Sequence, residues 1–202
     1  HQDVVDLLGP LIDRMEKDDE FKAKLMADQN IAGFIKGWGS RVEYHKALLD
    51  IKKHAVGDAD DDSFLEKARQ RMMAAYIANP RDIDVLIKMY RTQGDKSWRS
   101  AVKSQLRAAE GLRLSTIKNY KDALTRGGLN PQKVQYEEAL AEALNNYAWL
   151  ICNTEGDFEQ ALKYSLESLE IREDSAKLDT CGRCYFALGD LDNAIRVQKK
   201  AL

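Results

Sequence analysis

The sequence is poor in the features that mark secreted, membrane and disulfide-bonded proteins. Only three prolines and three cysteines occur among 202 residues. An odd, small number of cysteines makes no disulfide framework and favours a reducing compartment, so we expect a cytoplasmic protein. No apolar run approaches the roughly 18 residues that a membrane span needs, and no signal-peptide pattern opens the chain. We therefore expect no membrane partner.

An excess of charge of one sign is also missing. The chain has 31 basic and 33 acidic residues, which gives a net charge of −2. A nucleic-acid-binding domain needs a basic excess gathered on one surface, so no nucleic-acid partner is expected. The two signs are mixed along the chain, as on the solvated faces of helices.

Motifs that carry catalysis or hold cofactors are absent as well. The sequence contains no GxxxxGK[ST], no HExxH, and no cysteine and histidine close together. Asp58, Asp60 and Asp62 alternate as in a calcium loop, but Ser63 and Arg69 stand where that loop needs Gly and Glu. We expect no enzyme, no cofactor and no metal; these aspartates instead form a solvated linker that ends in a helix N-cap.

Residues that favour helices are abundant, and apolar residues recur at helical spacing, so we predict an all-α chain. The acidic linker divides an N-terminal helical region, residues 1–57, from a helical array, residues 63–202. Whether the first region consists of degenerate repeats stays open. Its stripe of Tyr44, Leu48 and Ile51 predicts a hairpin with the helix after the linker. Within the array, the last helices are predicted at 131–155, 157–173, 175–188 and from 190 to the end.

Two stretches of the array repeat each other. "LNNYAWLI" from Leu144 aligns with "LDTCGRCY" from Leu178 at an offset of 34, since 178 − 144 = 34. In both, apolar or small residues fall on one helix face. A turn of Gly, Asp and an apolar residue follows, beginning at Gly156 and Gly189, and an alanine lies five residues after each glycine. A period of this length is typical of helix–turn–helix arrays.

This unit resembles the tetratricopeptide repeat, most clearly over residues 141–202. The family's apolar, small, aromatic, glycine and alanine positions are filled by Leu178, Cys181, Gly182, Tyr185, Gly189 and Ala194. The resemblance implies a TPR-like α-α superhelix, a right-handed solenoid of helical hairpins. The last 60 residues also look like a bacterial subgroup. Because the chain begins at His1 and stops within its last predicted helix, we expect a fragment of a longer protein.

The resemblance further implies a non-catalytic scaffold that binds a peptide or protein segment in a concave groove. Trp149 is the expected anchor, although it would equally suit packing against a neighbouring helix. Arg183 suits a carboxylate, whereas Asp179 beside it opposes the carboxylate clamp of some family members. The partner-binding residues that the resemblance implies are Glu142, Asn145, Asn146, Trp149, Asp179, Arg183 and Phe186.

Two alternatives remain. A structural or self-associating spacer could stack copies through Ile195 and Ala201 on the last helix. The CxxC of Cys181 and Cys184 could serve redox chemistry or a metal, but zinc needs two more ligands and only Cys152 is left. A thioredoxin-type motif would also begin a helix rather than lie within one. We therefore predict that these cysteines are buried as small apolar residues.

Overall fold

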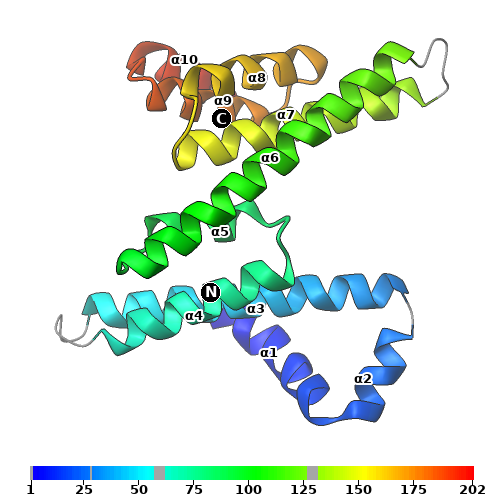
Figure 1. The fold of residues 1–202 in the computed structure, drawn as a ribbon, viewed down its shortest axis with the longest axis vertical. Helices are drawn as coiled ribbons and strands as arrows, with labels where there is room; N and C mark the ends of the chain where they lie inside the picture. The colour runs from blue at the N-terminus through cyan, green and yellow to red at the C-terminus, as the bar shows by residue number, and fades with distance from the viewer. Residues whose placement is uncertain (1, 28, 57–61, 127–131) are drawn as a thin grey trace. The chain divides into compact units, whose positions relative to one another are not determined.

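The computed structural model describes residues 2–27, 29–56, 62–126 and 132–202. All regular secondary structure in these ranges is α-helix (Figure 1), which confirms the predicted all-α class. Residues 57–61, which hold most of the predicted linker, including Asp58 and Asp60, lie outside the described residues.

The helices fall into two compact units, residues 1–99 and 100–202, each of which is described by itself. In the first unit each helix contacts the next one along the chain, α1 also packs against α3, and the centre of the unit is the pair α3 and α4. Its helices are α1 (Gln2–Lys17), α2 (Asp19–Met26), α3 (Gln29–Val56), α4 (Ser63–Ala78) and α5 (Ile83–Arg91). Helix α1 continues through Pro10.

The predicted hairpin between the N-terminal region and the helix after the linker is formed by α3 and α4. The residues that α3 buries differ from the predicted apolar stripe, because Val42 and Ala47 are fully buried while Tyr44 is half-buried. The Ser40 hydroxyl donates to the Ala75 carbonyl at 2.9 Å. Since the Ser40 side chain reaches the main chain of α4, the two helices approach closely at this small residue.

The second unit holds the predicted array from residue 100 onward, including its clearest stretch, residues 141–202, whereas the part from residue 63 to 99 belongs to the first unit. Its helices are α6 (Lys96–Arg126), which begins just before the boundary between the units, α7 (Lys133–Asn153), α8 (Phe158–Ile171), α9 (Ser175–Ala187) and α10 (Leu191–Ala201). The pairs α7–α8 and α9–α10 form hairpins, and α9 also packs against both α7 and α8. The core between these helices contains Leu144, Tyr147, Ile151 and Ala161.

Local signals in the sequence explain where these helices begin and end. Gly156 and Gly189 adopt φ values of 139° and 80°, a region that glycine occupies without steric cost. The helices α8, α9 and α10 each begin at an aspartate, Asp157, Asp174 and Asp190, whose carboxylate accepts from a backbone N–H in the first turn. These caps satisfy donors that a helix start otherwise leaves without partners.

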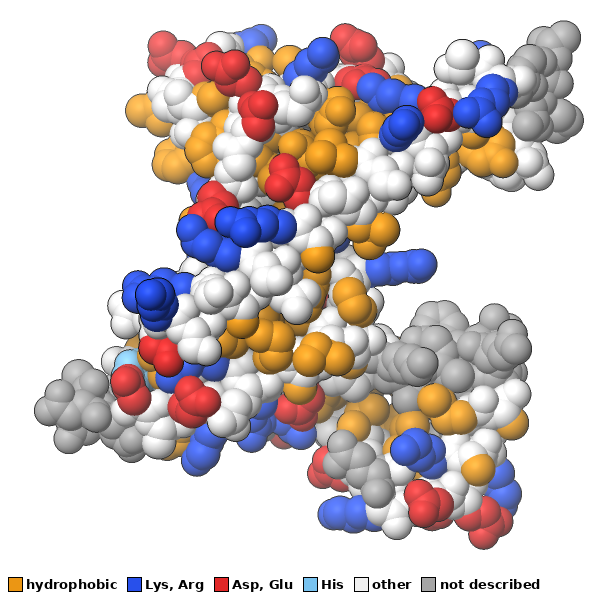
Figure 2. All heavy atoms as spheres, in the orientation of Figure 1, with side chains coloured by type: hydrophobic (Ala, Val, Ile, Leu, Met, Phe, Trp, Pro, Cys, Tyr) orange, Lys and Arg blue, Asp and Glu red, His pale blue; other side chains and the backbone are white. Residues whose placement is uncertain are grey.

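The surface carries charge of both signs on each unit (Figure 2). Lys and Arg side chains stand among Asp and Glu side chains on the face shown, as the mixed sequence predicts. Among the described residues, no helix is long and apolar enough to cross a membrane.

Truncation of the core of the second unit should destabilise it strongly. Leu144 is fully buried on α7, whereas Leu166 is exposed on α8 of the same hairpin. We expect Leu144→Ala to lower the free energy of unfolding by about 2–5 kcal/mol because it leaves a cavity, and Leu166→Ala to lower it by less than about 1 kcal/mol. Urea denaturation followed by far-UV circular dichroism measures both. Equal losses of unfolding free energy in the two variants would contradict the position of Leu144 in this core.

Candidate functional site

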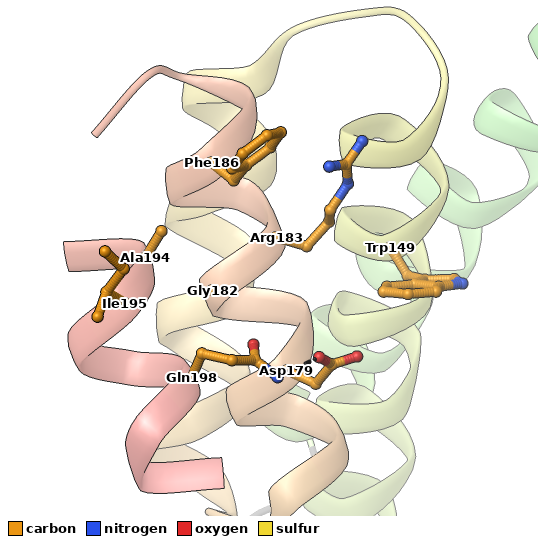
Figure 3. A pocket seen from close by; sticks show the side chains of 8 residues that line it. All are labelled: Trp149, Asp179, Gly182, Arg183, Phe186, Ala194, Ile195 and Gln198. Atoms are coloured by element: carbon orange, nitrogen blue, oxygen red, sulfur yellow. Dashed lines mark hydrogen bonds between the residues drawn. The ribbon is translucent and has the colours of Figure 1, made fainter. Parts of the chain in front are cut away.

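A pocket of about 310 Å³ opens on the second unit (Figure 3). Helices α7, α9 and α10 supply its walls. Its lining residues are Trp149, Asp179, Gly182, Arg183, Phe186, Ala194, Ile195 and Gln198. Four of the seven predicted partner-binding residues are therefore brought together in one place.

The polar side chains of the pocket are held by neighbours within the unit. Asp179 accepts a hydrogen bond from the Gln198 side-chain amide at 2.8 Å. Arg183 donates from Nε to Asn153 Oδ1 at 3.1 Å, and its guanidinium carbon lies 5.1 Å from the centroid of the Phe186 ring. In Figure 3 the Arg183 side chain extends from α9 between Phe186 and Trp149. The charged groups are thus positioned before any ligand arrives.

Apolar side chains make up most of the remaining wall. Trp149 is half-buried on α7, so neither the anchor nor the packing interpretation is excluded by its burial. Phe186 is 55% exposed and Ile195 is 56% exposed. Large apolar side chains exposed beside one another in a pocket are typical of interaction surfaces rather than of ordinary solvated helix faces.

The other three predicted residues lie on α7 outside the pocket. The Glu142 carboxylate pairs with the Lys177 ammonium at 2.5 Å. The Oδ1 atom of Asn145 is buried and accepts no hydrogen bond from a described residue, and Asn146 is exposed. The structure therefore gives Glu142 a partner on α9, within the protein itself.

Lys177 is a polar residue that sequence reasoning missed. Its side chain is only 2% exposed and also pairs with Asp174 at 2.8 Å. Burial by itself would lower the pKa of Lys177, but the hydrogen bonds and charges of Asp174 and Glu142 outweigh burial and raise that pKa. The hydrogen bond from Lys177 in turn lowers the pKa of Asp174. The i, i+3 spacing from a capping aspartate to a lysine was the available signal.

Residues from α10 were also missed, because the resemblance assigned the binding surface to the first helix of each repeat. Ala194, Ile195 and Gln198 line the pocket from the second helix of the last repeat. Helix α10 passes close to Gly182, since a Cβ atom there would lie 3.5 Å from the Ala194 carbonyl oxygen, an ordinary contact distance, and 2.8 Å from Gln198 Oε1 at the end of a flexible side chain.

In the preceding copy of the repeat, the surface that corresponds to the pocket is covered by another helix. Phe186 aligns with Cys152, since 186 − 34 = 152, and Gln198 aligns with Ser165, since 198 − 33 = 165. Cys152 is only 3% exposed and Ser165 is fully buried. Helix α9 covers this surface, because its Cys184 Sγ lies 2.7 Å from Cys152 Sγ. An α-helix therefore occupies in the first copy the place that is open in the second.

The three cysteines are free thiols and all are buried. Cys181 and Cys184 lie within α9, in the apolar environment that the repeat predicted for them. No cluster of His, Cys, Asp and Glu within the described ranges could hold a metal ion.

Comparison with known families gives one match. Residues 181–202, which cover the second half of α9 and all of α10, match the tetratricopeptide repeat model. No curated protein matches the chain. This match and the all-helical architecture of the described residues fit a TPR-type repeat protein with a TPR-like helical repeat fold, as the resemblance predicted.

Neutralising Asp174 should make the stability of the chain less dependent on pH. Asp174→Asn keeps a good N-cap but removes the charge that faces Lys177. Because the folded pKa of Asp174 is lowered, the contribution of its carboxylate is complete above the ordinary pKa of about 3.9 and is lost as the pH falls through the folded value. We expect the variant to be less stable than the wild type at neutral pH, and the difference to vanish in acid.

Urea denaturation of both proteins over a series of pH values measures this difference. The matched control is Asp157→Asn, which removes a capping charge that no ammonium contacts among the described residues. A difference between wild type and Asp174→Asn that stays constant from neutral to acid pH would contradict the role of the ion pair.

Proposed function

We propose that the chain is a non-catalytic interaction scaffold whose α9–α10 pocket binds a helical segment of a partner protein. Tetratricopeptide repeats are in general protein-interaction scaffolds without catalytic activity, which supports this class of function. The observation that carries the proposal is a comparison of the two copies of the repeat. In the first copy, the surface of α7 and α8 that corresponds to the pocket is covered by a helix, α9.

The chemistry of the proposed segment follows from α9. Where α9 covers the earlier repeat, it buries Leu178, Cys181 and Cys184, which are small or medium apolar residues spaced three apart. A helix with such a stripe would lie over Trp149 and Phe186. We propose that apolar contacts supply most of the binding free energy and that polar contacts fix the orientation of the segment.

The charges in the pocket favour a segment with polar groups at the ends of its apolar stripe. Asp179 and Arg183 are one turn apart on α9 and carry opposite charges, so the pocket does not select a strongly acidic or strongly basic ligand. The remaining predicted residues, Glu142, Asn145 and Asn146, extend the proposed surface along α7.

Trp149 is the proposed anchor of the segment, because it combines large contact area with a polar ring nitrogen. Helical peptides selected from a random library on the immobilised chain provide a measurable ligand. We expect Trp149→Ala to weaken the binding of these peptides by about 30-fold or more, since an anchor residue is worth at least about 2 kcal/mol. Isothermal titration calorimetry measures the change.

Phe186→Ala is the second test variant, because its exposed side chain contributes little to folding. Leu112→Ala is the matched control, since Leu112 is exposed on α6 and does not line the pocket. Circular dichroism checks that each variant is folded. Peptides that bind the wild type and both pocket variants equally would place the binding surface elsewhere.

A self-associating spacer is the second candidate function. The observation in its favour is that Leu191 and Ile195 are exposed together on α10, where a second copy could cover them. Ala201, the other predicted contact, is half-buried. In this case the occupant of the surface would be another copy of the same chain.

Sedimentation equilibrium separates the two candidates. Under the proposed partner-binding function we expect the mass of a monomer at all concentrations, for the wild type and for Ile195→Glu. A mass that rises with concentration in the wild type, and stays monomeric in Ile195→Glu because the charge opposes burial, would favour the spacer.

A further inference from the structure

We propose that Cys152 and Cys184 form a reversible disulfide that joins α7 to α9. The oxidisable pair of the chain would then lie across two helices of adjacent repeats, and the CxxC of Cys181 and Cys184 would not be the site. This proposal does not depend on the proposed binding function.

The two sulfur atoms are already adjacent. Cys152 Sγ and Cys184 Sγ lie 2.7 Å apart as free thiols, and a disulfide bond is about 2.05 Å long. The helices that carry them are in direct contact. Little more than a rotation of the two side chains therefore separates the thiols from a bond.

A second contact holds the same two helices together at the neighbouring positions. Asn153 follows Cys152, Arg183 precedes Cys184, and the Arg183 side chain donates to Asn153 at 3.1 Å. Cys181, by contrast, lies near α8, because the Ser165 hydroxyl of that helix acts on the pKa of its thiol, whereas the sulfur of Cys184 contacts that of Cys152. The geometry thus pairs Cys184 with Cys152 and leaves Cys181 apart.

The environment of the pair makes it slow to react. The hydrogen bond with Cys152, together with burial, raises the pKa of the Cys184 thiol. Cys184 is therefore a neutral thiol at physiological pH, whereas the thiolate is the reactive form. Oxidation requires an opening of the α7–α9 contact that admits a small oxidant, so brief exposure leaves the pair reduced.

A peroxide supplies the oxidant for the proposed step. One thiolate attacks a peroxide oxygen of hydrogen peroxide, which gives a sulfenic acid and, after protonation of the leaving hydroxide, one water. The second thiol sulfur then attacks the sulfenic sulfur, the S–S bond forms and a second water leaves. The two thiols together lose two electrons and two protons, and a dithiol such as dithiothreitol reverses the reaction by exchange.

The bond would tie the last two repeats together. It would join residues that are 32 apart in the chain, since 184 − 152 = 32, and would remove loop-closure entropy from the unfolded state. We expect the Tm of the transition that unfolds the second unit to rise by roughly 10 °C on oxidation and to return on reduction.

To test this, the full chain is treated with hydrogen peroxide at a low urea concentration that permits the α7–α9 contact to open, and the urea is then removed. We expect the intact mass to fall by two hydrogen atoms, one thiol to remain titratable, and protease digestion to yield a peptide pair that links Cys152 and Cys184. Cys181→Ala is the matched control and should form the same bond. Cys152→Ala and Cys184→Ala should not form it and should show no rise in Tm.

Three outcomes would overturn the proposal. They are a peptide that links Cys181 to Cys184, a mass that increases by oxygen atoms with no linked peptide, and three titratable thiols after treatment. Peptide mapping of the wild type decides between them even if a cysteine variant fails to fold.

Discussion

The second unit depends on the contact of α9 with both helices of the preceding hairpin. Small residues lie at this contact, since the Cys184 thiol of α9 reaches both the Cys152 sulfur and the Ala148 carbonyl oxygen of α7. Repeat arrays gain most of their stability from such neighbouring interfaces, because a single hairpin cannot bury its own apolar face. Lys177 adds a buried ion pair at one end of this contact, where its two carboxylate partners compensate for its desolvation.

The helices of the second unit could be predicted because their boundaries are marked locally. Capping aspartates such as Asp174, and the glycines with positive φ that begin the turns, act within a few residues of one another. In the first unit, the pairing of α3 with α4 was also predictable from apolar spacing. Which face of α3 is buried was not predictable. The small residue Ala47 permits a closer approach of the partner helix than the larger Tyr44, and only that helix decides which of the two residues is covered.

The candidate site could be predicted only in part, for a related reason. Trp149, Asp179 and Arg183 were identified because they occupy matching places in a repeat. Gln198 and the buried Lys177 were not, because packing between helices brings them to their partners and no sequence spacing encodes that distance. The nearness of Cys152 to Cys184 likewise depends on how α9 lies against α7, whereas the conspicuous CxxC spacing reflects only one helix.

The two copies of the repeat differ in a way that limits what the open pocket can hold. Cys152 lies under α9 in the first copy, and the larger Phe186 takes the corresponding place in the second. A helix that approached α9 as closely as α9 approaches α7 would clash with this ring, because close-packed interfaces do not absorb a phenyl group in place of a thiol. A partner helix of the proposed kind would therefore lie farther from α9, or present a small side chain opposite Phe186. Under the proposed function, the segment would be related to α9 in its apolar spacing and would differ from it in its contact residues.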